Sequence, residues 1–542
     1  MKYLKILDCT LRDGAYVVEK NFGNSVIKGI VKNLIDANID LIEIGFLQNE
    51  GFGEGKTVFS KPDDALKLLP ENIKDIDFAL LADYSRYDFD LLPINTNFKI
   101  NIIRICFFKH ERFLVIDAIK KTIAKGYSVY VQPVDILGYS DSELLDLIEE
   151  VNKTDSTCFS VVDTFGSMYI EDLRRLYYFI NHNLNKDIQI GFHSHNNLQL
   201  SSALSQEFIR MSQNERDITI DASLNGMGRG AGNTPTELVA LYANKKINCN
   251  YNIHALLDCI DVYIKPIAAK FNWGYNLPYF IAGMYSAHTN NINYLLEKNN
   301  ILSKDISLIL SQLEVDKIKR YDYARLEELY LEYIGKINID DSNDFTRLAK
   351  IFNKKNILVL APGNSIIKEK DKILKYIKDT DCIVVNINFI DPNFQNDFFY
   401  VSNIKRFEYL KLNSSFIEKP KIFLSNIQSS TQNFFRINAD RVVQKGWSNL
   451  DNSIILFFRL LDYFELQSLA IAGFDGFVFG QQNYFKDEME IQKNKKEIKK
   501  INTELEDMFN NFIATRKSKY EIIILTKTNL NLKKGCASVD SF

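Results

Sequence analysis

The sequence predicts an α/β protein made of an N-terminal (β/α)8 TIM barrel with a helical extension, followed by a C-terminal Rossmann-like α/β domain. Short β-branched apolar runs alternate with longer amphipathic stretches, which is typical of repeated βα units. Eight such repeats fall within about 245 residues, the usual size of a closed barrel. The alternation resumes after a polar break near residue 340. The expected ranges are 1–248 for the barrel, 249–340 for helices packed on it, and 350–530 for the second domain.

The barrel strands are expected where these apolar runs occur, with helices such as Ser25–Ala37 and Gln199–Met211 between them. A doubly wound open sheet is the alternative, although it rarely needs eight units. The expected strands are Tyr3–Asp8, Leu41–Gly45, Phe78–Ala82, Ile102–Phe107, Ser128–Pro133, Phe159–Asp163, Ile188–His193 and Thr219–Ser223.

The second domain is expected to begin at KKNILVLAPGNS, where a strand, a turn and a helix follow the polar stretch Asp340–Asp344. Repetition of this pattern favours a parallel sheet. Its expected strands are Asn356–Leu360, Cys382–Asn386, Lys421–Leu424, Ser468–Ala472 and Tyr520–Thr526.

Composition excludes several classes of function. The 542 residues exceed one ordinary hydrophobic core. The formal net charge of −3 offers no global attraction for nucleic acid or anionic membranes. No signal peptide or membrane-spanning run stands out, and no CxxC pair occurs among the seven cysteines. We therefore expect a cytoplasmic protein with reduced thiols that acts on small molecules.

Three motifs that carry chemistry follow predicted barrel strands, at the end of the barrel where active sites lie. LDCTLRDG places Arg12 and Asp13 after the first strand, and GFHSHNN places His193 and His195 on one side of the seventh. SLNGMGRGAGN is a glycine-rich turn that delivers Asn233 after the eighth. Closure of the barrel makes these strands neighbours, so residues far apart in sequence would meet.

Two imidazoles and a carboxylate suit Mn²⁺, Mg²⁺, Co²⁺ or Fe²⁺ better than a closed structural zinc site. An HxH pair alone is usually incidental, and RDG alone is a turn, but their convergence favours a metal site at Asp13, His193 and His195. A metal with an open position can chelate a 2-oxo acid and stabilise the enolate formed when a carbon–carbon bond breaks. Arg12 can donate to the same developing oxyanion.

TLRDG, HSHNN and GMGRGAGN resemble the signatures of the DRE-TIM metallolyases, which include HMG-CoA lyase, isopropylmalate synthase and 4-hydroxy-2-oxovalerate aldolase. The resemblance covers about residues 1–300 and implies that Asp13, His193 and His195 are metal ligands, with Mn²⁺ expected and Mg²⁺ or Co²⁺ as alternatives. It implies that Arg12 stabilises the enolate and that Asn233 ligates or supports the metal.

Within this family the glycine-rich loop is most similar to that of the 4-hydroxy-2-oxo-acid aldolases. The loop lacks the catalytic cysteine of the HMG-CoA lyases, and Ala15 stands where the Claisen-type synthases carry a glutamate.

Tyr16 departs from the family pattern, because the pyruvate aldolases carry a histidine base at this position. A tyrosine with a pKa near 10 is a poor base at neutral pH. Tyr16 is either tuned by the metal and Arg12, or orients a water or substrate hydroxyl, or leaves proton transfer to another group. AGMYSAH resembles a family stretch whose tyrosine approaches the substrate, which nominates Tyr285. His288 is a candidate base or an exposed helical histidine.

Other candidates for substrate binding follow or lie within barrel strands, among them Glu43 at the second strand. Arg104 interrupts an apolar run and is expected to point into the barrel, either toward a substrate carboxylate or into an ion pair with Glu43. Thr164 and Ser167 follow Asp163 in VVDTFGSM. Arg229, in the glycine-rich loop, either meets an anionic substrate group or is exposed to solvent.

In the second domain, NILVLAPGNS resembles the strand-to-helix turn of a nucleotide-binding fold. It has neither a GxGxxG nor a GxxxxGK[ST] motif. The region 350–530 resembles Rossmann-like domains of bacterial surface-carbohydrate proteins, including sialyltransferase-like ones. That resemblance implies a nucleotide or sugar-nucleotide pocket at Gly363, Asn364, Ser365 and Asp475; a purely structural turn is the alternative.

The sequence therefore favours a metal-dependent aldolase that cleaves or forms a 4-hydroxy-2-oxo acid through a metal-bound pyruvate enolate. Association with the second domain suggests a sugar-derived aldehyde for a surface polysaccharide. Two alternatives stay open for the C-terminal half: a nucleotide-sugar-dependent transferase, or a binding or assembly module without catalysis. Barrels of this family commonly pair, so a homo-oligomer is expected.

Overall fold

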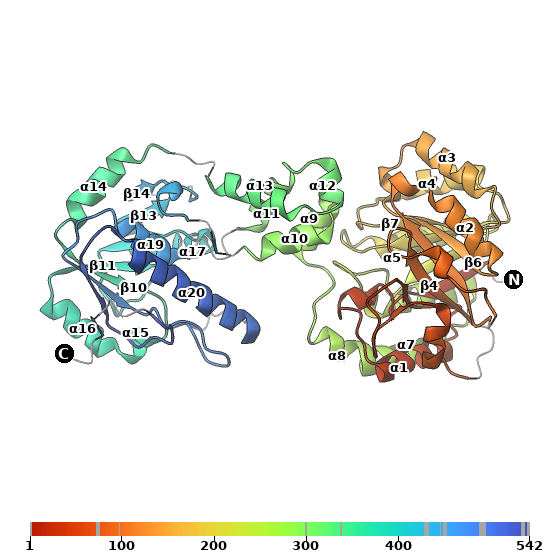
Figure 1. Ribbon diagram of the computed structural model, residues 1–542, viewed down its shortest axis with the longest axis horizontal. Coiled ribbons are helices and arrows are strands. Elements are labelled where there is room, and N and C mark those ends of the chain that lie inside the picture. The colour runs from red at the N-terminus through yellow and green to blue at the C-terminus, as the bar shows by residue number, and fades with distance from the viewer. Residues whose placement is uncertain are drawn as a thin grey trace. The chain divides into compact units, whose positions relative to one another are not determined.

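The computed structural model describes residues 3–71, 76–96, 98–298, 301–335, 339–427, 433–444, 446–447, 452–486, 495–532 and 537–538. The chain forms two compact units (Figure 1), one of Met1–Ile292 with Glu314–Tyr321 and one of Asn293–Leu313 with Asp322–Phe542. The residues predicted as one helical extension, 249–340, are thus divided between the two units.

The first unit contains a closed parallel barrel, which confirms the predicted (β/α)8 fold. Its strands follow the order β1-β9-β8-β7-β6-β5-β4-β2, and β1 pairs with β2 to close the ring. Within the described part of the chain, the short strand β3 pairs only with β2. The strands are β1 (Leu4–Asp8), β2 (Leu41–Leu47), β3 (Val58–Phe59), β4 (Asp77–Asp83), β5 (Ile100–Phe107), β6 (Ser128–Pro133), β7 (Cys158–Asp163), β8 (Gln189–Ser194) and β9 (Ile218–Ala222).

Amphipathic helices surround the barrel and bury their apolar stripes against the strands. In α3, Ser140 caps the first turn by accepting from the Glu143 N–H, while the Glu143 carboxylate accepts from the Ser140 N–H. These helices are α1 (Asn24–Asp36), α2 (Val115–Ala124), α3 (Asp141–Val151), α4 (Ile170–Asn183), α5 (Ser201–Ser212), α6 (Thr236–Ile247), α7 (Ile253–Cys259) and α8 (Lys265–Ala268). The unit also contains α9 (Leu277–Met284) and α12 (Val315–Lys319), and α10 (Thr289–Leu296) is divided between the two units.

The second unit is built on an eight-stranded parallel sheet with the order β14-β13-β12-β11-β10-β15-β16-β17. After β14 the chain returns to the middle of the sheet and places β15 beside β10, so the topological switch point lies between these two strands. The strands are β10 (Asn356–Leu360), β11 (Cys382–Ile387), β12 (Phe398–Val401), β13 (Lys421–Leu424), β14 (Phe434–Ile437), β15 (Ser468–Ala472), β16 (Glu521–Ile524) and β17 (Ala537–Ser538).

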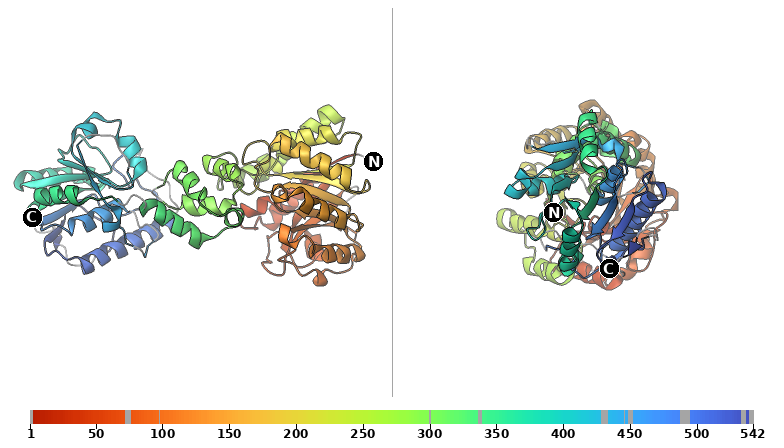
Figure 2. Two further views of the ribbon diagram at one scale, coloured as in Figure 1. Left: turned by 90° about the horizontal axis from the view of Figure 1, so that it is seen from above. Right: turned by 90° about the vertical axis from the view of Figure 1, so that its left-hand side faces the viewer.

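Helices cover both faces of this sheet (Figure 2), because alternate residues of each strand are apolar on both sides. Helices α14, α19 and α20 share one core with Ile357 and Val359, and α15 and α16 share another with Leu358 and Leu360. The helices are α11 (Ser303–Leu310), α13 (Tyr323–Gly335), α14 (Ser342–Phe352), α15 (Ser365–Lys368), α16 (Lys370–Asp379), α17 (Ile404–Leu410), α18 (Ser414–Glu418), α19 (Ser453–Leu461) and α20 (Lys495–Thr515).

None of the helices in the described ranges combines the length and apolar composition needed to cross a bilayer. The six cysteines within these ranges are all free thiols.

Candidate functional site

The barrel brings the three predicted motifs together at the carboxyl ends of adjacent strands. Arg12 and Asp13 follow β1, His193 lies in β8, and β9 pairs with both of these strands. The loop after β9 folds back so that Asn233 forms a backbone bridge with His195. The convergence inferred from the sequence is therefore present in the structure.

Asp13, His193 and His195 form a cluster that fits a divalent metal ion. Each offers a ligand atom, and these atoms all lie within 4.8 Å of one another. Asn233 donates from Nδ2 to Asp13 Oδ2 at 2.5 Å, and its Oδ1 is buried without a hydrogen-bond partner among the described residues. A buried acceptor of this kind beside two imidazoles and a carboxylate completes a mixed N/O donor set, which suits Mn²⁺ or a similar ion.

The protonation states of the cluster also suit a metal, since a ligand must present a lone pair. Burial lowers the pKa of His195 to about 3, so its imidazole is neutral at neutral pH. Burial alone would raise the pKa of Asp13, but Arg12, the two histidines and Arg229 together outweigh burial, lower the pKa and keep that carboxyl ionised.

Arg12 is held rigidly beside the cluster. Its Nε donates to Glu43 Oε2 at 2.7 Å, and its Nη1 donates to Asp13 Oδ1 at 2.9 Å. These two bonds fix the guanidinium plane and leave Nη2 without a partner among the described residues. The arginine can therefore donate to an oxygen that binds next to Asp13.

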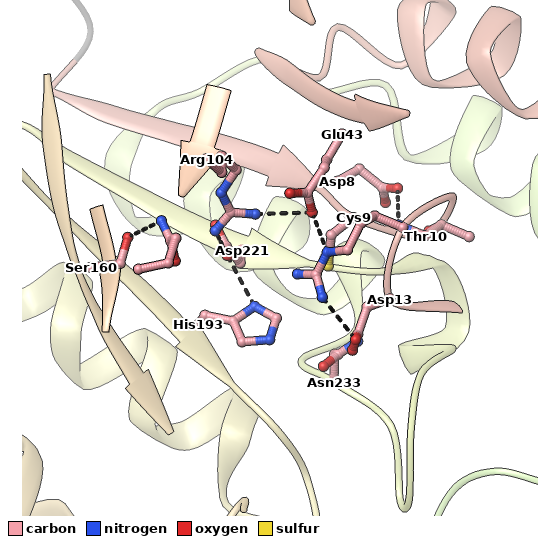
Figure 3. A network of polar contacts seen from close by, with 12 residues as sticks. Asp8, Cys9, Thr10, Asp13, Glu43, Arg104, Ser160, His193, Asp221 and Asn233 are labelled. Atoms are coloured by element: carbon pink, nitrogen blue, oxygen red, sulfur yellow. Dashed lines mark hydrogen bonds and ion pairs between the residues drawn. The ribbon is translucent and has the colours of Figure 1, made fainter. Parts of the chain in front are cut away.

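A buried ion network lies behind these residues (Figure 3). Arg104 is only 1% exposed and pairs with Glu43 and with Asp221. Asp221 in turn accepts from His193 Nδ1 at 2.9 Å, which leaves His193 Nε2 as the ligand atom. Glu43 and Arg104 were predicted to contact substrate, with an ion pair between them as the alternative. Both are buried and form this ion pair, which favours the alternative. We infer that they position Arg12 and His193.

The sequence did not nominate Asp221 as a functional residue. An acidic residue inside the apolar run ITIDA could have indicated a buried, paired carboxylate.

Asp221→Asn is expected to weaken Mn²⁺ binding about 10- to 100-fold, the usual effect of removing a carboxylate that orients a ligating histidine. Isothermal titration calorimetry with Mn²⁺ measures this. Asp217→Asn, at an exposed position four residues earlier, is the control and should bind like the parent. Equal affinities for both variants would contradict the role given to Asp221.

The glycine-rich loop can approach Asp13 because Gly228 has no side chain. A Cβ added there would lie 2.9 Å from Asp13 Oδ2 and would also collide with the Asn233 amide. The loop therefore closes tightly over the cluster and carries Arg229 with it. The Arg229 guanidinium lies 4.0 Å from the centre of the Tyr16 ring and is half-buried.

Tyr16 lies in the short helical turn Gly14–Tyr16 directly after Asp13. Burial raises the pKa of its phenol, so the hydroxyl stays protonated at neutral pH. This protonation state fits a hydroxyl that orients a water or substrate and does not fit a general base.

The remaining predicted barrel residues lie in two neighbouring loops. Thr164 Oγ1 accepts from the Asp135 N–H at 2.8 Å, and Ser167 Oγ accepts from Ser286 Oγ at 3.0 Å. Ser286 directly follows Tyr285 at the end of α9, so this segment packs against the loop after β7. His288 precedes α10 and is half-buried, with Nδ1 accepting from the Asn290 N–H at 3.1 Å.

In the second unit, the four residues predicted to bind a nucleotide do lie together at the switch point. Every backbone N–H of the turn is already hydrogen-bonded within the protein. Gly363 donates to Gly473 O at 3.1 Å, Asn364 to Asn483 O at 3.1 Å, and Ser365 to Asp475 Oδ2 at 2.7 Å. The Asp475 carboxylate thus occupies the position at the start of α15 that a phosphate would take.

A cavity of about 620 Å³ lies elsewhere in this unit. It adjoins the carboxyl end of β11, and its lining includes Asn388, Asp391, Arg406 and Lys419. None of the four predicted residues lines it. Their arrangement alone therefore does not support a nucleotide pocket at the turn.

Known proteins match the barrel part of the chain in sequence. The sequence profile of the HMGL-like family matches residues 3–262. A 4-hydroxy-2-oxovalerate aldolase of Thermomicrobium roseum is 27% identical over 280 residues, which are 48% of this chain and 73% of the relative. The enzyme of the same name from Pseudoalteromonas translucida is 24% identical over 327 residues, 58% of this chain and 91% of the relative. An oxaloacetate decarboxylase of Mycobacterium tuberculosis is 28% identical over 237 residues, 43% and 67% of the two chains.

The family match agrees with the position of the three motifs, since Asp13, His193, His195 and Asn233 all lie inside the matched range. Residues 3–262 of this chain therefore match the HMGL-like family, and the relatives named aldolase support a carbon–carbon lyase as the activity of the barrel.

Proposed function

We propose that the barrel cleaves or forms a 4-hydroxy-2-oxo acid by joining or splitting pyruvate, as its enolate, and an aldehyde. The observation that supports this most is the placement of Arg12, which Glu43 and Asp13 hold with one guanidinium nitrogen free beside the candidate metal ligands. Relatives named 4-hydroxy-2-oxovalerate aldolase agree with this reaction. A sugar-derived aldehyde is one candidate for the second substrate.

Asp13, His193 and His195 would hold the metal, and Asn233 would supply or support a fourth ligand. Mn²⁺ is the expected ion, with Mg²⁺ and Co²⁺ as alternatives. When bound, such an ion supplies Lewis acidity toward the oxygens of a 2-oxo acid.

The residues of the chain supply the remaining stabilisation. Arg12 donates a hydrogen bond to the oxygen that gains negative charge as the enolate forms. Tyr16, protonated and close to Asp13, orients the aldehyde oxygen or a water molecule.

The test is exchange of the pyruvate methyl protons for deuterium, followed by NMR with the full chain. It requires no knowledge of the aldehyde. Exchange with Mn²⁺ that stops on addition of a chelator would support the proposal. A protein that binds Mn²⁺ and shows no exchange would overturn it.

Arg12→Lys is expected to slow this exchange about 100- to 1000-fold, the usual cost of losing one preorganised donor to an oxyanion. Lysine keeps the positive charge but cannot bond Glu43 and Asp13 in one plane while a third donor faces the substrate. Arg210→Lys, on the surface of α5 and paired with Glu207, is the control and should exchange at the parental rate. Near-parental exchange in Arg12→Lys would show that the guanidinium geometry is not used.

A further inference from the structure

Two aromatic rings at the mouth of the barrel each carry a cation. The Tyr16 and Phe46 rings meet edge to face, with centroids 5.5 Å apart. Arg229 lies over the Tyr16 ring at 4.0 Å, and Lys20 Nζ lies over the Phe46 ring at 4.7 Å. Tyr16 follows β1, Phe46 lies near the end of β2, and Arg229 follows β9, so this group lies at the same end of the barrel as the candidate metal cluster.

Neither cation forms an ion pair among the described residues. Among the described residues, no carboxylate oxygen lies within 4.0 Å of a side-chain nitrogen of Arg229 or Lys20. Lys20 donates to the neutral amide of Gln48 at 2.9 Å. Burial lowers the pKa of Lys20, and the positive charges of Arg86 and Arg229 lower it further.

A second, independent observation concerns His288. Its Nδ1 accepts from the Asn290 N–H at 3.1 Å, so in the neutral ring the hydrogen is on Nε2. That Nε2 lies 3.3 Å from Arg229 Nη1, which is also a donor. Two donors cannot bond to each other, but both can bond to one anionic oxygen placed between them.

We propose that Arg229 and His288, with Lys20 nearby, bind an anionic group on the aldehyde, either a phosphate or a carboxylate. This inference rests on the proposed aldolase function and adds the class of aldehyde to it. The carboxylate of pyruvate is not the anion in question, because it is expected next to Arg12 and the metal ligands. The negatively charged end of the aldehyde would face the group formed by Tyr16, Arg229 and His288.

The test compares pairs of aldehydes in which one member carries a terminal anionic group: glyceraldehyde with glyceraldehyde 3-phosphate, and butanal with succinic semialdehyde. Aldol addition is measured at saturating pyruvate and Mn²⁺. Arg229→Met is expected to raise KM for the preferred anionic aldehyde about 10- to 100-fold, since a charged hydrogen bond is lost. KM for the uncharged partner should rise less than KM for the anionic aldehyde, because the uncharged aldehyde makes no charged hydrogen bond. Preference for one anionic aldehyde identifies phosphate or carboxylate.

Arg229→Lys should retain part of the preference, and Arg210→Met, outside the barrel mouth, should retain all of it. Equal losses for charged and uncharged aldehydes, or a rise in KM for pyruvate alone, would overturn the inference. Calorimetry of the full chain with glyceraldehyde 3-phosphate or succinic semialdehyde, without pyruvate, tests the anion site independently of the proposed aldolase reaction. Binding of an anionic aldehyde that is lost in Arg229→Met supports the anion site even if pyruvate exchange fails. If the parent protein binds neither of these two aldehydes, the inference of an anion site is wrong.

Discussion

Asp13→Asn is expected to reduce metal-dependent pyruvate exchange by more than about 100-fold, beyond the usual effect of losing an outer partner of a ligand. The substitution removes the only carboxylate of the Asp13, His193 and His195 cluster. It also leaves Arg12 Nη1 and Asn233 Nδ2, which now donate to this carboxylate, facing a side chain with one oxygen fewer. Mn²⁺ affinity by calorimetry and pyruvate exchange by NMR measure the two consequences separately.

Asp8→Asn is the matched control, since it makes the same change to a buried aspartate at the end of the same strand. Asp8 accepts hydrogen bonds from Thr10 and Thr236, and burial raises its pKa to about 6. An amide can replace this carboxyl with little loss, so Mn²⁺ affinity should be parental. If Asp13→Asn binds Mn²⁺ like the parent, or if both variants lose the same Mn²⁺ affinity, Asp13 is not a metal ligand.

Arg104→Met is expected to lower the free energy of unfolding of the barrel by about 3–5 kcal/mol, the usual cost of breaking a buried ion pair. Arg104 is 1% exposed and pairs with Glu43 and Asp221, whose side chains are 0% and 2% exposed. Methionine fills a similar volume but leaves these carboxylates without their shared cation. Urea denaturation of the full chain measures the loss, and the barrel transition is the one that Mn²⁺ shifts to higher urea.

The control is Arg210→Met, which removes an exposed arginine paired with Glu207 on α5. Exposed ion pairs contribute only about 0–1 kcal/mol, so this variant should unfold with the parent. A loss in Arg104→Met as small as in the control would mean that the buried network contributes no net stability. The positioning role inferred for Glu43 and Arg104 would then need another basis.

The strands of the barrel could be predicted from the sequence because each is a short apolar run that is recognised from neighbouring residues alone. All eight predicted ranges overlap observed strands, and Ser128–Pro133 matches β6 in full. In the second unit, β12, β14 and β17 were missed. The first two are aromatic runs of four residues, too short for an alternating pattern to distinguish a strand from a loop. The third follows residue 530, beyond the range expected for the domain.

The candidate site was predictable where its residues belong to contiguous motifs. RDG, HSH and the glycine-rich loop nominated Arg12, Asp13, both histidines and Asn233, and barrel closure brings them together. The roles of single charged residues were not predictable in the same way. Arg104 was expected to meet either a substrate or Glu43, and only its burial and pairing favour the second alternative.

The sequence by itself predicted the repeated βα units of the barrel, the parallel second sheet and the motifs of the candidate metal site, since each is a pattern of residues close together in the chain. Only the tertiary structure decided which groups satisfy one another. The hydrogen bond that Asp221 accepts from His193 connects residues 28 positions apart. The two facing donors, Arg229 Nη1 and His288 Nε2, belong to residues 59 positions apart. The turn at Gly363 is filled by Asp475 through a contact between Ser365 and a residue 110 positions away. Such pairings follow from strand order and register, which no local pattern of residues specifies.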